Sequence, residues 1–303
     1  PVYNSFNDQF IPALYAHLQA KGWLNMWYQH LADEPHDQGG YELYNDLTDR
    51  IRAYAPGMKI GDAYYSQEAE NFLVNRNVDW FVPREELYTA NVNRYESLAA
   101  SGKTVTLYNC NWPQNDYMNR FIDKPVYQNR LQGWLAYTTG RNSFLHWGWN
   151  YWFNELHYKQ FIWPDDELWK GDHYIVYPDT ANNKIKDTIR SANTRDAAED
   201  FEVFKILEQT NAALAKNISE SIVPDSLHYS KNINLMIAAK NQLVRAAGNA
   251  STNVSCWNLN AASGTTAADS WGSNTGTIVG TPTWVSGASG NALQFNGTNT
   301  GID

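Results

Sequence analysis

Cysteine is nearly absent from this chain of 303 residues, which contains only Cys110 and Cys256. The two lie far apart in regions of different character, so we expect them to be unpaired, and neither forms a metal-binding motif. There is also no run of lysines or arginines, and the formal net charge is -9. No segment has the roughly 18 uninterrupted apolar residues that a membrane span needs. We therefore predict no metal or other cofactor, no nucleic acid partner and no membrane span.

The chain also lacks an initiator methionine and a recognisable signal peptide. It opens on Pro1-Val-Tyr-Asn, directly before a segment of helical character. We therefore expect it to be a fragment of a longer protein, whose own signal peptide would lie outside this fragment.

Aromatic residues, by contrast, are abundant: 13 Trp, 19 Tyr and 11 Phe make up 14 % of the chain. Surplus tryptophan and tyrosine can simply fill a hydrophobic core. Where many of them lie near strand ends, however, they also suit stacking against the apolar faces of sugar rings. The composition therefore favours a carbohydrate ligand, while ordinary core packing remains the alternative.

Residues 1–160 alternate between predicted strands and predicted helices. Helical spacing and turn residues delimit five strands, at 23–32, 58–65, 78–82, 104–110 and 143–149. The helices between and before them are predicted at 7–20, 41–54, 68–75, 91–101 and 126–139. Such alternation indicates a parallel sheet wrapped by helices.

Two architectures fit this alternation, an open doubly wound sheet and a closed eightfold barrel. No glycine-rich phosphate loop follows any strand, which counts against a nucleotide-binding doubly wound fold. Polar and aromatic residues instead follow the strand ends, and all these ends meet on one face of an eightfold barrel, where its active site lies. The predicted fold is therefore α/β: a partial (β/α)8 TIM barrel that holds the five C-terminal strands, the first three being missing upstream of Pro1.

The pattern changes in the second half of the chain. Residues 161–248 are predicted to contain a loop and a short barrel-closing strand, followed by two long helices at 185–215 and 232–247. After Gly248 the composition shifts to Gly, Ser, Thr and Asn, and short strands separated by glycine turns are expected. Residues 249–303 are therefore predicted to be the start of an all-β module that is too short to form a complete sandwich.

The apolar, aromatic run that starts at Trp23 ends abruptly in two adjacent carboxylates, Asp33 and Glu34. Charged residues are rarely buried without a partner or a task. This pair is therefore either an ion-pair anchor or part of an active site. Glu85 could serve as a separate nucleophile in an ordinary two-carboxylate glycosidase, although an exposed loop acid is the simpler interpretation of it. The other carboxylates near predicted strand ends are Asp62, Glu86 and Glu155.

The adjacent pair suits a different mechanism, in which the 2-acetamido group of the substrate supplies the nucleophile. Asp33 would orient and charge-stabilise the acetamido nitrogen, and Glu34 would protonate the leaving oxygen. Consecutive strand residues point to opposite faces, so both carboxylates reach one ligand only if the strand bends, which Pro35 favours. Glu34 must stay protonated near neutral pH, which the Asp33 carboxylate and aromatic walls would favour. The pair is expected to titrate as a coupled unit.

Further substrate contacts are expected from side chains near the strand ends. His30 could hydrogen-bond within the site or could be a buried structural histidine. The candidate sugar walls are Tyr64, Tyr65, Trp112, Trp147 and Trp149, and core packing is the alternative for each. Asn150 is a candidate for hydrogen bonding to the substrate. By strand alternation, Trp147 and Trp149 are expected to be both inside the site or both outside it.

Three stretches occur together: Asp33-Glu34-Pro35, Gly171-Asp-His-Tyr-Ile-Val-Tyr-Pro178 and Thr188-Ile-Arg-Ser-Ala-Asn-Thr-Arg-Asp-Ala-Ala-Glu-Asp-Phe-Glu202. In combination they resemble glycoside hydrolase family 123, the β-N-acetylgalactosaminidases and their relatives, over roughly residues 2–209. The resemblance implies an eightfold-barrel catalytic domain preceded by a β-sandwich, and a catalytic pair at Asp33 and Glu34 with substrate-assisted, retaining chemistry. The third stretch departs from the usual family pattern at Ser191-Ala-Asn-Thr, which bears on the exact sugar more than on the chemistry.

The stretches Ser255-Cys-Trp-Asn-Leu-Asn260 and Gly290-Asn-Ala-Leu-Gln-Phe-Asn-Gly297 resemble the start of a laminin-G or concanavalin-like jelly roll. Such modules are often appended to secreted bacterial glycosidases. The resemblance therefore implies an extracellular or cell-surface location and a second surface for sugar binding or adhesion.

Together these features predict an extracellular, exo-acting, retaining β-N-acetylhexosaminidase that prefers galactosamine. Its partner would be a glycan with a terminal N-acetylhexosamine. Two alternatives stay open: a non-catalytic carbohydrate-binding or adhesion protein, and a glycosidase with a separate carboxylate nucleophile.

Overall fold

The computed structural model describes residues 2–152, 171–248, 256–270, 274–287 and 290–303. The chain divides into two compact units. The first comprises residues 1–197 with 225–227, and the second comprises 198–224 with 228–303. The domain boundary expected at residue 160 lies outside the described residues. The boundary expected after Gly248 lies next to residues 249–255, which are also outside the described residues. Within the described ranges, no helix is both long enough and apolar enough to cross a membrane.

The first unit begins with the alternating helices and strands expected from the sequence. Asp37 caps the second helix by accepting a hydrogen bond from the Gly40 N–H at 2.7 Å, and Ser66 caps the third helix through the Ala69 N–H. Up to residue 108 the elements are α1 (Val2–Ala20), a 3-10 turn (Leu24–Met26), β1 (Tyr28–His30), α2 (Gln38–Tyr54), β2 (Lys59–Tyr64), α3 (Gln67–Asn75), β3 (Trp80–Pro83), α4 (Glu85–Ala90), α5 (Val92–Ala100), β4 (Thr104–Val105) and β5 (Leu107–Tyr108).

The first unit continues with α6 (Tyr127–Thr138), β6 (Phe144–Leu145), β7 (Tyr177–Asp179), β8 (Lys184–Lys186) and the first residues of α7 (Ile189–Ile222). The long helix expected from residue 185 begins only at Ile189, because β8 pairs with β7 in an antiparallel hairpin. The strand expected at 143–149 is reduced to the two residues of β6.

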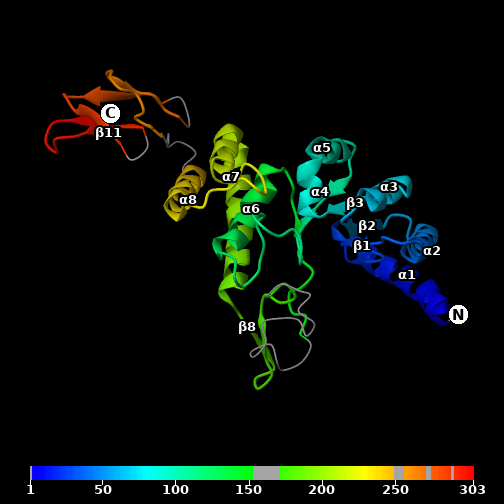
Figure 1. Ribbon diagram of the computed structural model, residues 1–303. Helices are drawn as coiled ribbons and strands as arrows, with labels where there is room; N and C mark the ends of the chain where they lie inside the picture. Colours follow the sequence, from blue (N-terminus) through cyan, green and yellow to red (C-terminus); the bar gives the residue numbers. More distant parts are fainter. Residues whose placement is uncertain (1, 153–170, 249–255, 271–273, 288–289) are drawn as a thin grey trace. The chain divides into compact units, whose positions relative to one another are not determined.

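The strands of the first unit are parallel and follow one another in sequence order. Four of them form a sheet in the order β1-β2-β3-β4, and β5 pairs in parallel with β6. A parallel bridge between Arg84 and Tyr108 connects the end of β3 to β5. This order lacks the reversal typical of a doubly wound sheet. Figure 1 shows β1 to β3 side by side with α2 to α5 around them. The predicted parallel α/β arrangement is confirmed; no closure into a barrel is present among the described strands.

The sheet carries different side chains on its two faces because alternate residues of a strand point in opposite directions. Ala63, Val82 and Tyr108 form a buried cluster on one face. Tyr64 and Phe81 lie on the other, where α3 packs on β2 and β3.

The chain before the acid pair is less regular than predicted. The strand expected at 23–32 consists of a 3-10 turn and the three residues of β1. Trp23 and Met26 are exposed; they lie at the 3-10 turn before β1 and so outside the sheet. In α1, Ile11 and Leu18 are buried, whereas Phe10 is exposed.

The described part of the second unit contains the rest of α7, α8 (Ile233–Gly248) and five short strands. Asn211 interrupts α7 with φ -151° and ψ 77°, so this element is two helices joined at a kink. Within the unit, Lys240 of α8 forms an ion pair with the buried Asp200 of α7. The strands are β9 (Thr266–Ala267), β10 (Gly276–Val279), β11 (Thr283–Ser286), β12 (Asn291–Gln294) and β13 (Gly301–Ile302).

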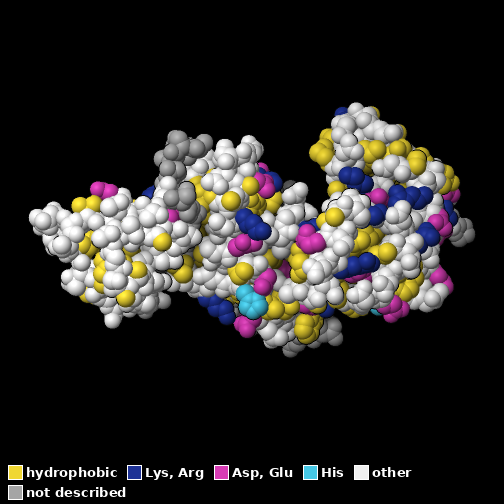
Figure 2. Space-filling model, turned by 90° about the horizontal axis from the view of Figure 1, so that it is seen from above, with side chains coloured by type: hydrophobic (Ala, Val, Ile, Leu, Met, Phe, Trp, Pro, Cys, Tyr) yellow, Lys and Arg dark blue, Asp and Glu magenta, His cyan; other side chains and the backbone are white. Residues whose placement is uncertain are grey.

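The C-terminal strands are antiparallel, as expected for an all-β segment. They form a three-stranded sheet in the order β13-β10-β9 and a separate β11-β12 hairpin. Asp269 and Asp303 are the only charged residues in the sequence between 256 and 303, and Figure 2 shows a mainly uncharged surface there. On the visible face of the first unit in the same figure, basic and acidic side chains are interspersed.

Candidate active site

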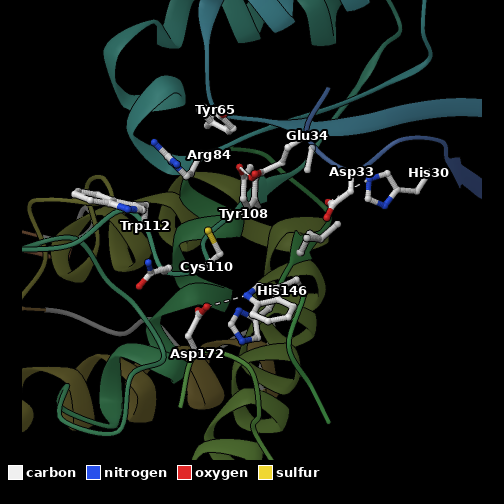
Figure 3. A pocket seen from close by; sticks show the side chains of 14 residues that line it. His30, Asp33, Glu34, Tyr65, Arg84, Tyr108, Cys110, Trp112, His146 and Asp172 are labelled. Carbon is white, nitrogen blue, oxygen red and sulfur yellow. Dashed lines mark hydrogen bonds and ion pairs between the residues drawn. The ribbon is translucent and has the colours of Figure 1, made fainter. Parts of the chain in front are cut away.

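A pocket of about 800 Å³ lies in the first unit, at the carboxyl ends of its parallel strands (Figure 3). Each of β1, β2, β3, β5 and β6 contributes residues that directly follow it or end it. This is where parallel α/β sheets place their ligands. The lining residues are His30, Asp33, Glu34, Ala63, Tyr65, Arg84, Tyr108, Cys110, Asn111, Trp112, Leu145, His146, Trp147 and Asp172.

Six of the nine residues predicted from the sequence line this pocket: His30, Asp33, Glu34, Tyr65, Trp112 and Trp147. Tyr64 does not, and the expectation that it forms a sugar wall is wrong. Its side chain is fully buried on the opposite face of β2, against Phe81.

Trp149 and Asn150 also lie outside the pocket lining. The alternation argument placed Trp147 and Trp149 together, but β6 ends at Leu145, so strand alternation does not extend to either tryptophan. Asn150 instead forms an antiparallel bridge with Tyr174.

A bend in the chain brings both acids of the pair to the pocket. Regular strand structure ends at His30, and Glu34 adopts a left-handed conformation with φ 51°. Such a conformation is uncommon for a residue with a side chain, and even less favoured before a proline such as Pro35. Strained residues of this kind cost about 1–3 kcal/mol and cluster at active sites. The bend also removes the objection that consecutive strand residues point to opposite faces.

Glu34 lies in surroundings that favour its protonated form. The Tyr108 hydroxyl donates a hydrogen bond to Glu34 Oε1. Burial raises the pKa of Glu34; the Tyr108 hydrogen bond lowers it, the Asp33 charge raises it further, and the net shift is upward. A general acid needs its pKa shifted in this direction to carry a proton near neutral pH. The Asp33 side chain, by contrast, is 89 % exposed and open to a ligand.

Asp62 braces the segment that leads into the acid pair. Its buried carboxylate accepts hydrogen bonds from the backbone N–H groups of Leu31, at 3.2 Å, and Ala32, at 2.8 Å. Its other oxygen forms an ion pair with His30 Nε2, which also lies 3.9 Å from Asp33 Oδ1. Burial lowers the pKa of His30, but the hydrogen bond and the charge of Asp62 outweigh the effect of burial, so the net shift of this pKa is upward. Asp62 therefore acts on the backbone, and its oxygens are occupied.

We expect Asp62→Asn to lower the free energy of unfolding by about 1–3 kcal/mol, because the amide cannot serve as acceptor for both the backbone and His30. Urea unfolding at pH 7 measures this change. Asp46→Asn is the control, since Asp46 pairs with Arg50 on the surface and such pairs contribute little. Equal stabilities for the two variants would show that Asp62 is not a brace.

Asp172 lies on the other side of the pocket from the acid pair (Figure 3). It is fully buried, and its Oδ2 accepts a hydrogen bond from Trp147 Nε1 at 2.9 Å. Gly171 precedes it with φ 79°, a conformation natural for glycine. Arg190 donates to the carbonyl oxygens of Gly171, at 2.7 Å, and Arg120, at 2.9 Å. Arg190 thus holds the backbone on which Asp172 lies.

Burial raises the pKa of Asp172 to about 7, from a usual value of 3.8, although the Trp147 hydrogen bond and the nearby arginines lower it. The folded chain therefore binds more protons than the unfolded chain between those pH values. Raising the pH through this range destabilises the folded state by roughly 1.4 kcal/mol per unit, and the whole penalty is present above about pH 7. Asp172→Asn should remove this slope. Unfolding measured from pH 4 to 8 tests it; parallel pH profiles for wild type and variant would contradict it.

Glu85 is not the exposed loop acid expected from the sequence. It is the first residue of α4 and is fully buried, and the amide of Asn109 donates to its Oε1 at 3.2 Å. Burial raises its pKa to about 8, although the Arg120 charge lowers it. It does not line the pocket, so the geometry does not favour it as a separate nucleophile. Glu86 pairs with Arg84, and Glu155 lies outside the described residues.

Tyr108 and Cys110 line the pocket but were not among the residues predicted from the sequence. Both lie on the face of the fourth predicted strand that points to the pocket, and their two-residue spacing was the available signal. Burial also lowers the pKa of His146 to about 3, so this residue is neutral near pH 7. Among the described residues, no group of three His, Cys, Asp or Glu side chains could hold a metal ion.

The sequence matches the family model "Glycoside hydrolase 123, catalytic domain" over residues 1–207, close to the span of the resemblance noted above. A solved structure of a family 123 glycoside hydrolase from Clostridium perfringens, described as giving the details of glycolipid glycan hydrolysis, shares the fold with a TM-score of 0.53 and 20 % identity. The match covers 82 % of this chain but only 45 % of that structure. No curated protein matches. Because the family model covers more than half of the sequence, the chain belongs to glycoside hydrolase family 123.

Proposed function

We propose that the protein is a retaining glycosidase that removes a terminal 2-acetamido sugar from a glycan, with Asp33 and Glu34 as its catalytic pair. One observation carries this proposal: two adjacent carboxylates line one pocket, and they differ in environment. Asp33 is open to solvent, whereas Glu34 is partly buried and its pKa is raised. Carboxylates whose environments separate their protonation are typical of an acid and its partner.

In the first step, the carbonyl oxygen of the acetamido group attacks the anomeric carbon. The bond from that carbon to the leaving oxygen breaks, and Glu34 transfers its proton to this oxygen. Asp33 accepts a hydrogen bond from the acetamido N–H, which stabilises the positive charge of the cyclic oxazolinium intermediate. In the second step, water attacks the anomeric carbon and gives its proton to Glu34, while the bond from that carbon to the acetamido oxygen breaks and the acetamido group is restored. Two inversions at one carbon give net retention.

Aromatic side chains around the pair would hold the sugar ring. Trp112 and Trp147 line the pocket with 47 % and 42 % of their surfaces exposed. Tyr65 lies at the same pocket, with the Arg84 guanidinium 5.2 Å from the centre of its ring. Exposed aromatic rings beside the acid pair suit stacking on the apolar face of a sugar.

The finer features of the proposal rest on the sequence patterns and on the two resemblances, to family 123 and to a laminin-G or concanavalin-like module. They are a preference for N-acetylgalactosamine, an exo mode of action, an extracellular location, a partial (β/α)8 barrel and a laminin-G-like module from residue 249. A glycolipid-type glycan ending in N-acetylgalactosamine is a suitable substrate to test, because the similar clostridial enzyme is described in relation to glycolipid glycans.

The test is hydrolysis of two aryl β-glycosides that differ only at carbon 2. We expect the 2-acetamido-2-deoxy-β-galactoside to be cleaved and the β-galactoside, which carries a hydroxyl there, to be cleaved at least 100-fold more slowly. Equal rates would rule out participation by the acetamido group. Binding of both compounds without cleavage of either would instead support the non-catalytic alternative.

A further inference from the structure

A buried, unpaired oxygen faces the pocket opposite the acid pair. Asp172 is fully buried and lines the pocket, and its Oδ2 is bonded to Trp147 Nε1. Its Oδ1 has no partner that meets the geometry of a hydrogen bond, although the Asn111 backbone N–H lies near enough to the carboxyl group to lower its pKa. Buried polar atoms are almost always paired, so an exception in a native structure calls for a functional explanation.

Asp172 is held in place by its surroundings, so its free oxygen has a fixed position. Arg190 fixes the preceding carbonyl group, that of Gly171. The Trp147 N–H fixes Oδ2. In Figure 3, Glu34 and Asp33 lie toward one side of the pocket and Asp172 toward the other, with Cys110 between. A ligand bound with its reacting atoms at Glu34 would extend toward Asp172.

Trp147 adds an apolar surface at the same place. Its indole N–H is bonded to Asp172, but 42 % of the residue is exposed and it lines the pocket. An aromatic face with a carboxyl oxygen at its edge matches the two kinds of surface on a sugar ring: an apolar face of C–H groups and a hydroxyl at the rim. The neutral His146 beside it carries no competing charge.

We propose that Asp172 recognises the terminal sugar by accepting a hydrogen bond from one of its ring hydroxyls on Oδ1, while Trp147 stacks on the ring. This deepens the proposed function, because it assumes that the terminal sugar lies with its anomeric carbon at Glu34. Asp172 is thus a specificity-determining residue that takes no part in the bond-breaking steps.

The test uses Asp172→Asn, which keeps the size of the side chain. The Trp147 N–H still needs an acceptor, so the amide oxygen would take the place of Oδ2 and the NH2 group would face the pocket. At pH 8, above the Asp172 pKa of about 7, the carboxylate is ionised and a strong acceptor is thereby replaced by a donor. We expect the affinity for methyl 2-acetamido-2-deoxy-β-galactoside, measured by calorimetry, to fall about 10- to 100-fold.

Deoxy analogues identify the hydroxyl. The 3-, 4- and 6-deoxy forms of the same methyl glycoside are titrated into wild type and Asp172→Asn. One deoxy analogue should lack the hydroxyl that Asp172 binds. Wild type should bind this analogue more weakly than the parent sugar, by about the factor by which Asp172→Asn weakens binding of the parent sugar. Wild type and Asp172→Asn should then bind this analogue with affinities within about 3-fold of each other. If the variant weakens all four ligands equally, or none, or if wild type binds none of them, the inference is wrong.

Trp147→Phe and Trp23→Phe form a matched pair of controls. Trp23 is exposed to a similar degree, 48 %, but lies outside the pocket. Trp147→Phe keeps an aromatic face and removes the N–H that holds Asp172, so it should weaken the parent sugar while Trp23→Phe should not. Equal effects of the two would contradict the role of the Trp147 N–H in holding Asp172. Near-ultraviolet circular dichroism establishes that each variant is folded.

Binding and hydrolysis separate this inference from the proposed function. Hydroxyl-specific binding that depends on Asp172, without any hydrolysis of the aryl glycoside, would support the inference and refute the catalytic proposal. Hydrolysis by wild type, with no hydroxyl-specific effect of Asp172→Asn on binding, would support the catalytic proposal and refute the inference about Asp172.

Discussion

Glu34→Gln is expected to lower kcat/KM by about 10²- to 10⁴-fold for an aryl 2-acetamido-2-deoxy-β-galactoside with a poor leaving group. Glutamine keeps the size of the side chain but has no proton to give to the glycosidic oxygen. The loss should nearly vanish for a 2,4-dinitrophenyl leaving group, which departs without protonation. The leaving-group dependence, rather than the size of the loss, identifies Glu34 as the acid.

The measurement compares initial rates for the two leaving groups in wild type and variant. Glu42→Gln provides the control, because Glu42 lies exposed on α2, outside the pocket lining, and accepts a hydrogen bond from Gln38. Its rates should equal those of wild type. If Glu34→Gln slowed both substrates by the same factor, Glu34 would have a role other than proton donation.

Asp33→Asn is expected to lower kcat/KM by about 10²- to 10³-fold for both leaving groups alike, because Asp33 acts on the acetamido group and not on the leaving oxygen. The carboxylate stabilises charge that develops on the acetamido nitrogen in the transition state. Its removal should therefore reduce kcat as well as binding. Rates for the same two substrates test this.

The stability of Asp33→Asn should be close to that of wild type. The side chain is 89 % exposed, and its 3.9 Å contact with His30 is weak. An unchanged midpoint of urea unfolding, combined with a large kinetic loss, would establish that the residue acts on the substrate. A variant that kept wild-type rates would show that the pair is an ion-pair anchor for His30, the alternative that the sequence left open.

The order of the parallel strands could be predicted from sequence because helical spacing and glycine or proline punctuation are local signals. The predicted position of the site also follows from this order, since side chains after parallel strands meet at one edge of the sheet. The pocket accordingly includes Asp33, Glu34, Tyr65, Trp112 and Trp147.

The conformation of individual residues depended on contacts that no local pattern contains. Tyr64 and Tyr65 are adjacent in sequence, yet the end of β2 places one in the core and the other at the pocket. Asp172 reaches the pocket from a segment outside the sheet, where strand periodicity gives no information. The left-handed turn at Glu34 is held by the Asp62 brace and by Tyr108, both more than 25 residues away in sequence.

Binding of the thiazoline derived from N-acetylgalactosamine tests most directly whether Asp33 and Glu34 use the acetamido group of the substrate. This compound mimics the oxazolinium intermediate, and calorimetry measures its affinity without any turnover. We predict that it binds wild type tightly, that Asp33→Asn weakens it at least 10-fold, and that Glu34→Gln changes it by less than about 3-fold. Hydrolysis by a protein that does not bind the thiazoline, or equal binding by wild type and Asp33→Asn, would contradict the mechanism.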